Sequence, residues 1–304
     1  GCGFVGSTCA YTLMQHGLFS EMVLLDADRA RAEGEAMDIS HGLLFAKPMN
    51  IYAGDYDDLK DAAVVIITAG ANQKPGETRL DLVRKNAKIF RSIIPELNAR
   101  GFAGILLIVA NPVDILTRLT QQISDLPEER VFGSGTVLDT ARLKYLLGEH
   151  LSVDSRSVHT FIIGEHGDSE LAVWSGANVS GIGLDHFCEL RGHFDHAAAM
   201  KKIYEDVRDS AYRIIEEKGA TYYGIAMAVA RIAECIVKDE HAVLPVSTVL
   251  QGEYGLKGLA LSIPSVVGKS GVETVLEIPL SAQESAELQA SAGGLRRVIA
   301  TLPL

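Results

Sequence analysis

The chain opens with Gly1-Cys2-Gly3-Phe4-Val5-Gly6, a G-x-G-x-x-G pattern, and this stretch decides the fold. Glycines at this spacing are typical of the tight turn that joins a buried strand to a helix and holds a dinucleotide pyrophosphate at the helix N-terminus. Gly1 permits the tight turn, Gly3 permits close approach of the pyrophosphate, and Gly6 lets the helix pack on the strand. Because the turn needs a strand in front of it, we expect a short strand upstream of Gly1.

Asp26 strengthens this interpretation, since it ends the next apolar run, residues 22–26, about 20 residues beyond Gly6. A carboxylate at this position can accept hydrogen bonds from both hydroxyls of an adenosine ribose, and it would repel a 2′-phosphate. The pattern therefore predicts NAD rather than NADP. The alternative is a structural turn followed by a surface aspartate.

Further apolar runs at 64–68, 104–109 and 131–132 alternate with segments of helix length. Continuously apolar strands alternating with helices are typical of a parallel sheet covered on both faces, so we predict a Rossmann-type α/β domain over residues 1–133. The pattern of expected helices and strands changes after residue 133. We therefore predict that residues 134–304 form a mixed α+β domain that packs closely on the first. Within it we expect a strand over 159–164, a long helix over 197–218, paired strands over 243–267, and a last helix that begins with a capping box at Ser281.

Composition narrows the class of protein. The 304 residues include 47% hydrophobic residues, and 28 Lys+Arg against 39 Asp+Glu give a net charge of −11. This charge disfavours nucleic acids and anionic membranes as partners, and no apolar run approaches the roughly 20 residues that span a bilayer. Four scattered cysteines and the absence of a signal-peptide pattern predict a reducing cytoplasm.

A histidine between glycines marks the candidate catalytic segment, Ile163-Gly164-Glu165-His166-Gly167-Asp168-Ser169. It follows an apolar strand, so we expect an exposed imidazole on a constrained backbone. Histidine titrates near neutral pH and can exchange the proton that accompanies hydride transfer to a carbonyl. Taken alone, a histidine in such a loop is more often structural.

Several motifs together change that balance. They are the glycine turn with Asp26, Thr68-Ala69-Gly70, the loop Gln73-Lys74-Pro75-Gly76-Glu77-Thr78-Arg79, the run Val109-Ala110-Asn111-Pro112-Val113-Asp114, the stretch Leu138-Asp139-Thr140-Ala141-Arg142, and the segment around His166. In these motifs the whole chain resembles the lactate/malate dehydrogenase family, and within it the bacterial L-lactate-specific members. The resemblance implies reversible hydride transfer between L-lactate and NAD, as in glycolysis with pyruvate fermentation.

The resemblance also implies roles for single residues. His166 would donate the proton to pyruvate, and Asp139 would orient its imidazole and stabilise the charged form. Arg142 would bind the substrate carboxylate in a two-point contact that lysine cannot make. Arg79 would close over the site and polarise the carbonyl, and Asn111 would lie near the nicotinamide ribose and the substrate oxygen. The dinucleotide would contact Phe4 and Val5 in the turn, and Thr68, Ala69, Gly70 and Ile225 beyond it.

Specificity is expected to depend on Gln73, because in this family an arginine at its position accompanies dicarboxylate substrates. A neutral glutamine leaves a second carboxylate unpaired, and burying such a charge costs several kcal/mol. Thr221 would shape the pocket around the methyl group. The sequence therefore favours lactate, with malate or another 2-hydroxy acid as the alternative, and a protein that binds NAD without turnover as a third possibility.

Regulation and assembly are also implied by the resemblance. The family is usually tetrameric, so we expect a homotetramer. Relatives activated by fructose 1,6-bisphosphate pair a histidine with an arginine between subunits; His159 matches the histidine, but Lys144 stands in place of the arginine. Lysine lacks the planar two-point contact with phosphate, which argues against this activation and leaves it to be tested.

Two smaller patterns have alternative interpretations. His186, Cys188, His193 and His196 are of types that bind zinc, but their spacing matches no closed four-ligand pattern. We therefore expect no metal and interpret the segment as a solvated loop. Cys2 lies beside a helix N-terminus, which can lower a thiol pKa and make it redox-sensitive, but we favour the interpretation that it is merely a small residue that fits the turn.

Overall fold

The computed structural model describes residues 1–71, 78–193 and 196–300, and of Arg79 it describes only the backbone. The first half of the chain is built from alternating strands and helices, as the apolar runs predict. Its elements are α1 (Phe4–His16), β1 (Glu21–Leu24), α2 (Arg29–His41), β2 (Asn50–Ala53), β3 (Val64–Ile67), α3 (Arg79–Ala99), β4 (Ile105–Ile108), α4 (Val113–Ile123) and β5 (Val131–Gly133). The strand β2 has no counterpart among the runs singled out in the sequence.

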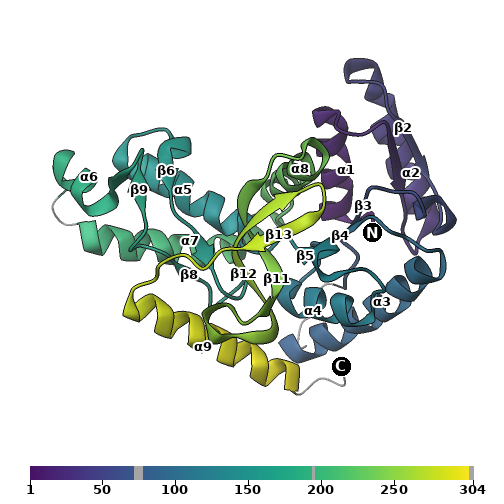
Figure 1. Ribbon diagram of the computed structural model, residues 1–304. Coiled ribbons are helices and arrows are strands. Elements are labelled where there is room, and N and C mark those ends of the chain that lie inside the picture. Colours follow the sequence, from purple (N-terminus) through teal and green to yellow (C-terminus); the bar gives the residue numbers. More distant parts are fainter. Residues whose placement is uncertain (72–77, 194–195, 301–304) are drawn as a thin grey trace.

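The second half combines helices with short and long antiparallel strands. Its elements are α5 (Val137–Leu151), β6 (Val158–His159), β7 (Ile162–Ile163), β8 (Leu171–Ala172), β9 (Asn178–Val179), β10 (Ile182–Gly183), α6 (Leu184–Leu190), α7 (His196–Lys218), α8 (Tyr223–Lys238), β11 (Ala242–Gln251), β12 (Lys257–Gly268), β13 (Gly271–Val275) and α9 (Ala282–Ala300). In Figure 1 the elements α5 to α7 lie at one side, α1 to α3 at the other, and β11 to β13 between them.

One six-stranded sheet runs through both halves, in the order β13-β12-β11-β5-β4-β3. The strands β3, β4 and β5 are parallel, which confirms the predicted parallel sheet, whereas β11 joins β5 in antiparallel orientation with Ser247 opposite Gly133. The pair β1-β2 is parallel and separate. Between these sheets, the backbone nitrogen of Gly1 donates to Leu25 O, 2.9 Å away, and Thr68 Oγ1 donates to Gly1 O at 2.8 Å. The strand expected ahead of Gly1 remains a prediction.

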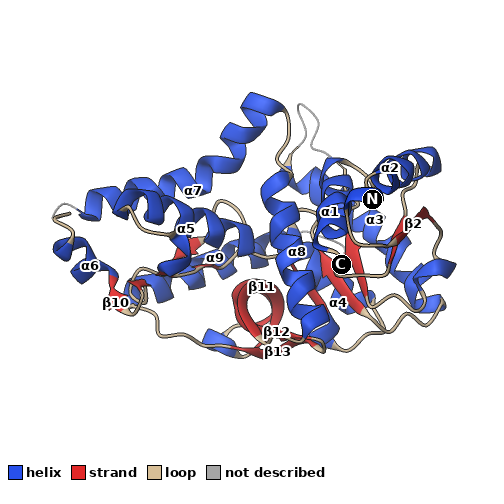
Figure 2. Ribbon diagram, turned by 90° about the horizontal axis from the view of Figure 1, so that it is seen from above, coloured by secondary structure: helices blue, strands red, loops and turns tan. Residues whose placement is uncertain are grey.

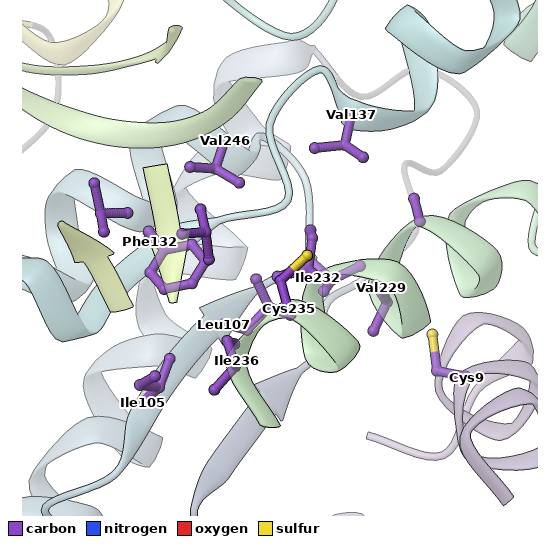
Figure 3. Close-up of a cluster of buried hydrophobic side chains, with 14 of the residues drawn as sticks. Cys9, Ile105, Leu107, Phe132, Val137, Val229, Ile232, Cys235, Ile236 and Val246 are labelled. Atoms are coloured by element: carbon purple, nitrogen blue, oxygen red, sulfur yellow. The ribbon is translucent and has the colours of Figure 1, made fainter. Parts of the chain in front are cut away.

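A shared core fastens the two halves together. Val229, Ile232 and Ile236 of α8 pack against Leu107 and Phe132 of the parallel sheet (Figure 3). Each is at most 4% exposed, and burying a side chain of this size contributes roughly 1.5–3 kcal/mol. Seen from above, α8 lies between the two groups of helices (Figure 2). The close packing expected from the absence of a linker is therefore confirmed.

Of the local predictions for the second half, the cap of the last helix is confirmed and one strand is wrong in part. The capping box of α9 is confirmed, because Glu284 N donates to Ser281 Oγ at 3.2 Å and Ser281 N donates to Glu284 Oε2 at 2.7 Å. The single strand expected over 159–164 is wrong in part, since β6 and β7 occupy its two ends and pair with different partners. Among the described residues, no helix combines the length and apolarity needed to cross a membrane.

Candidate active site

The glycine turn places the N-terminus of α1 beside the loop that follows β3. A Cβ atom on Gly6 would lie 1.8 Å from Gly1 O, and one on Gly1 would lie 2.8 Å from Ala69 Cα, so both positions exclude a side chain. A Cβ on Gly3 would have no heavy atom within 4 Å among the described residues. The backbone at Gly3, next to the N-terminus of α1, therefore leaves space into which a pyrophosphate fits.

Asp26 is fixed to this turn from the end of β1. Its Oδ2 accepts from Cys2 N at 2.6 Å and its Oδ1 from Asp28 N at 2.9 Å. Partial burial works to raise the pKa of Asp26, but these two backbone hydrogen bonds outweigh it, and the pKa lies below its usual range. The carboxylate is thus held ionised at the place where the sequence predicts a ribose. Cys2 is 3% exposed and burial raises its thiol pKa, so the alternative of a reactive thiolate is wrong.

Asn86 of α3 connects two candidate loops and was missed in the sequence. Its Oδ1 accepts from Ala71 N at 2.8 Å, directly after the Thr68-Ala69-Gly70 segment, and its Nδ2 donates to Asn111 O at 2.6 Å. Asn86 is only 2% exposed. It therefore fixes the backbone of Asn111 relative to the glycine turn. No motif in the sequence indicates this role of Asn86, because its partners lie 15 and 25 residues away along the chain.

A buried ion-paired set lies at the start of α5. Asp139 is 2% exposed; its Oδ2 lies 2.6 Å from His166 Nδ1, and its Oδ1 accepts from Arg142 Nη1 at 2.8 Å. Asp139 and Arg142 are three residues apart and share one face of the helix, whereas His166 comes from the loop after β7. The structure thus brings together three of the four predicted catalytic and carboxylate-binding side chains.

The backbone around His166 is constrained on both sides. Gly164 has φ +94° and Gly167 has φ +141°, conformations that other residues rarely adopt. The N–H of His166 donates to Asp114 Oδ2 at 2.8 Å, and Asp114 Oδ1 accepts from Ser247 Oγ at 2.6 Å. The His166 side chain is 24% exposed, so the imidazole is less accessible than the flanking glycines predicted.

Electrostatics favour the charged form of this imidazole. Burial works to lower the pKa of His166, but the charge of Asp139 and its hydrogen bond to Nδ1 prevail and raise the pKa to about 9. Burial likewise works to raise the pKa of Asp139, but His166 and Arg142 hold it below its usual range. At neutral pH the pair is therefore an imidazolium beside a carboxylate. Burial raises the pKa of Asp114 to about 6.

Glu170, also missed in the sequence, is a second acid at this site. It is 4% exposed, and its possible ligand atoms lie within 4.8 Å of those of Asp139 and His166. Burial and the charge of Asp139 raise the pKa of Glu170 to about 8. Three such residues can bind a metal ion in other proteins, but here Asp139 Oδ2 is at hydrogen-bond distance from His166, and Arg142 occupies Oδ1.

The remaining predicted contacts lie on α8 and the turn before it. Thr221 lies in the connection between α7 and α8, and Ile225 in the first turn of α8 packs against the shared core, as does Val5. A Cβ on Gly224 would lie 2.9 Å from Leu138 Cδ1, which brings the start of α8 against α5 next to Asp139. Phe4 is 68% exposed and its ring stacks on Tyr222 with centroids 5.5 Å apart.

Two predicted residues fall outside what the structure describes. Gln73, the expected specificity residue, lies in the segment 72–77, and the side chain of Arg79 is not described. The backbone of Arg79 begins α3, directly after Thr78, whose side chain and Asp81 form a capping box. The roles of Gln73 and Arg79 therefore stay predictions from the sequence.

The candidate effector residues lie apart from His166. His159 is exposed in β6 and lines a pocket of about 620 Å³ together with Phe161, Asn178 and Ile278. Lys144 is half-buried in α5, and burial lowers the pKa of its ammonium. Neither residue contacts the ion-paired set through a hydrogen bond among the described residues.

The histidine-rich segment differs from its expected form. Residues 184–190 form the helix α6 rather than a solvated loop, and Cys188 is fully buried in it. His196 Nε2 pairs with Asp185 Oδ1 at 3.2 Å, while the rings of His150 and His193 lie 4.9 Å apart. The buried face of α6 explains the error, because Leu184 and Cys188 pack against the cluster beneath α5 and α7.

A glycine turn of the dinucleotide-binding type and a histidine paired with a buried carboxylate are together typical of an NAD(H)-binding α/β oxidoreductase. Comparison with known proteins identifies the family. Residues 1–133 match the model of the lactate/malate dehydrogenase NAD binding domain, and residues 136–302 match that of the lactate/malate dehydrogenase alpha/beta C-terminal domain. The chain belongs to the lactate/malate dehydrogenase family.

Curated relatives are similar over nearly the full length. An L-lactate dehydrogenase of Acetivibrio thermocellus is 51% identical, covering 100% of this chain and 96% of that protein. One of Thermoanaerobacterium saccharolyticum is 52% identical, covering 100% of this chain and 98% of that protein. Among solved structures, the minor L-lactate dehydrogenase from Enterococcus mundtii is 44% identical with a TM-score of 0.97 in its ligands-bound form, covering 100% of this chain and 97% of that one. Its ligands-unbound form gives a TM-score of 0.91 with 44% identity, covering 100% and 96%. The overall conformation is thus closer to the bound form.

Proposed function

We propose that this protein catalyses the reversible reduction of pyruvate to L-lactate with NADH. The observation that carries the proposal is the buried set of Asp139, Arg142 and His166, in which a protonated imidazole and a guanidinium meet in one site. The names of the curated relatives support the substrate. When bound, the reduced nicotinamide supplies the hydride.

His166 supplies the proton in this proposal. With a pKa raised to about 9, the imidazole is charged at neutral pH and can protonate the oxygen that forms at the substrate carbonyl. Asp139 holds Nδ1 at 2.6 Å and so keeps Nε2 free to face the substrate. In the reverse direction, neutral His166 accepts the hydroxyl proton of lactate. Pyruvate therefore binds the protonated enzyme and lactate the deprotonated enzyme.

Arg142 binds the substrate carboxylate. Its side chain is 15% exposed, and Asp139 engages Nη1, which leaves Nε and Nη2 as donors for a substrate carboxylate. We assign polarisation of the carbonyl to Arg79, contact with the substrate oxygen to Asn111, the methyl pocket to Thr221, and exclusion of dicarboxylates to Gln73. These four roles rest on the family resemblance.

The dinucleotide is assigned to the glycine turn, with Gly3 leaving space for the pyrophosphate. Phe4 and Val5 extend the turn, Thr68, Ala69 and Gly70 line the end of β3, and Asn111 and Ile225 complete the nicotinamide side. The ionised carboxylate of Asp26 favours NAD over NADP, because a 2′-phosphate would meet a negative charge. The two matched family models support a division of the chain at residue 133.

We further propose a homotetramer, which rests on the family resemblance alone. We also propose a reducing cytoplasm, supported by four unpaired, buried cysteines. His159 and Lys144 remain the candidates for a fructose 1,6-bisphosphate site, with lysine disfavouring a strong response. Light scattering of the purified protein and assays with and without the bisphosphate test these points. A monomer, or activation comparable to an arginine-containing site, would contradict them.

The deciding experiment follows NADH oxidation with pyruvate and with oxaloacetate side by side. We expect pyruvate to be strongly preferred, and His166→Asn to lower kcat by about 10²- to 10⁴-fold while NADH still binds. Replacing Gln73 with Arg is expected to move the preference toward oxaloacetate. Preference of the unmodified protein for oxaloacetate would overturn the substrate assignment, and full activity of His166→Asn would overturn the mechanism.

A further inference from the structure

Glu170 is a buried acid that the mechanism above does not use. It is 4% exposed, and its Oε1 has no hydrogen-bond partner among the residues that the structure describes. Its possible ligand atoms lie within 4.8 Å of those of Asp139 and His166. The backbone of Gly167 hydrogen-bonds the carboxyl group, but burial and the charge of Asp139 outweigh this contact, so the neutral acid is favoured.

The backbone fixes Glu170 in this place. It directly precedes β8, its N–H donates to Gly167 O at 3.1 Å, and the hydroxyl of Tyr204 in α7 donates to its carbonyl oxygen. Leu171, the next residue, is 2% exposed in the core beneath α9. These contacts therefore fix the backbone of Glu170 beside the ion-paired set.

The charged and titratable groups that face Glu170 come from three directions. Asp139 and Arg142 lie on α5, His166 on the loop after β7, and Tyr204 on α7. Asp114 of α4 contacts the other side of this loop through the N–H of His166. Burial raises the pKa of Tyr204 to about 12, so Tyr204 stays neutral at every pH where His166 and Glu170 titrate.

The net charge of this site depends on whether Glu170 is ionised. Asp139 is paired with Arg142, and protonated His166 adds one positive charge, which suits a monoanion such as pyruvate. If Glu170 ionises, this positive charge is cancelled and the substrate carboxylate enters a site with a second negative charge. If His166 instead loses its proton, no proton donor remains. Loss of either proton thus impairs pyruvate reduction.

We propose that Glu170 is a positioning residue that must carry a proton when pyruvate binds, so that His166 and Glu170 together hold two protons in the productive state. This inference rests on the proposed function. It predicts that above the pKa values of both groups the logarithm of kcat/KM for pyruvate falls with a slope approaching two per pH unit. A single required proton gives a slope of one.

The test measures kcat/KM for pyruvate from about pH 6 to about pH 10 in the unmodified full chain, in Glu170→Gln and in Tyr204→Phe. Glu170→Gln cannot ionise, so its slope is expected to be one, and relative to neutral pH it should retain about tenfold more activity at the alkaline end. Tyr204→Phe loosens the same segment but keeps the carboxyl, so its slope should remain near two.

A slope of one in the unmodified protein would overturn the inference whether or not any variant folds. Equal slopes in all three proteins, with activity lowered at every pH, would assign Glu170 a structural role only. A second readout is independent of turnover: ¹³C NMR of labelled histidine, with His166 assigned through His166→Asn. Because ionised Glu170 favours the imidazolium, the pKa of His166 should be lower in Glu170→Gln, and an unchanged value would contradict the proposal. Absence of pyruvate reduction at any pH would instead count against the proposed function.

Discussion

The glycine turn and the ion-paired pocket show two ways of building half of an active site. The turn is made of backbone, with exposed Gly1 and Gly3 and one partly exposed carboxylate, Asp26. The pocket is made of side-chain charges on Asp139, which is buried, and His166, which is partly exposed, and these residues lie 27 apart in the chain. Binding at the turn therefore depends on space and backbone donors, whereas chemistry in the pocket depends on which side chains are protonated.

The largest effect is expected where the pocket loses its charge. In Asp139→Asn the imidazole stays buried but loses its anionic partner, so the pKa of His166 should fall from about 9 to or below its ordinary value of 6.5. Pyruvate needs protonated His166, so activity should be lost at a lower pH than in the unmodified protein. We expect kcat/KM for pyruvate near neutral pH to drop by about 10²-fold or more.

The control for this variant is NADH affinity, measured by fluorescence titration, which should change little because the turn lies elsewhere. An alkaline limb at the same pH as in the unmodified protein would show that Asp139 does not set the pKa of His166. The unfolding temperature of both proteins is measured as well. An unchanged temperature indicates a local electrostatic effect, whereas a lower one indicates that α5 is destabilised by loss of the Asp139–Arg142 ion pair.

The next largest effect is expected in the glycine turn, where Gly6→Ala should distort the backbone and Gly3→Ala should not. In Gly6→Ala the new Cβ would lie 1.8 Å from Gly1 O, so the turn must shift, and we expect a loss of about 1–3 kcal/mol in the free energy of unfolding together with weaker NADH binding. Gly3 has φ −74°, which alanine adopts without strain, and its Cβ meets open space. Gly3→Ala should therefore weaken NADH binding while urea unfolding stays unchanged. Equal NADH affinity in Gly3→Ala and the unmodified protein would show that the pyrophosphate does not approach this position.

The sequence predicted the turn better than the pocket for a physical reason. Gly1, Gly3, Gly6 and Asp26 act through local geometry, so their spacing along the chain carries the signal. The pocket is assembled by tertiary packing, and only the family resemblance pointed to Asp139 and Arg142 as partners of His166. Nothing local distinguishes Glu170 from a surface acid, because its burial depends on the packing around β8 and α7.

The fold shows the same division. Strongly apolar runs predicted β1, β3, β4 and β5, and helical periodicity with capping predicted α7 and α9. The strand β2 escaped notice because Asn50–Ala53 contains only short apolar stretches and a half-buried face. The helix α6 was predicted as a loop because its polar residues, His186, Asp185 and Glu189, mask the periodicity of Leu184 and Cys188, which are buried on its inner face.

A smaller effect is expected from the single charge of the turn. In Asp26→Asn the side chain still accepts from a backbone N–H, but the repulsion of a 2′-phosphate disappears. We expect the ratio of NADPH to NADH dissociation constants to fall by about tenfold, equivalent to about 1.4 kcal/mol. Fluorescence titrations with both dinucleotides measure it. An unchanged ratio would place the adenosine ribose away from Asp26 and contradict its assigned role.

The smallest predicted effect concerns Asp114, which supports the pocket from α4 without joining its ion pairs. Burial raises its pKa in the folded protein to about 6, above the ordinary 3.8, so the folded state binds a proton that the unfolded state releases between these values. Its contribution to stability is therefore complete below the unfolded pKa and is lost as the pH rises through about 6. Asparagine cannot titrate. Between about pH 7 and about pH 5, the free energy of unfolding of the unmodified protein should gain about 1 kcal/mol relative to Asp114→Asn.

Urea unfolding of both proteins at each pH provides this difference, in which titrations common to the two cancel. A difference independent of pH would mean that Ser247 Oγ and the His166 N–H, which donate to Asp114, keep the carboxylate ionised despite its burial. Asp114 would then resemble Asp26, which is also held ionised by two hydrogen-bond donors, in that case both backbone N–H groups. Donor number, rather than depth in the protein, would then decide which acids of this molecule carry charge.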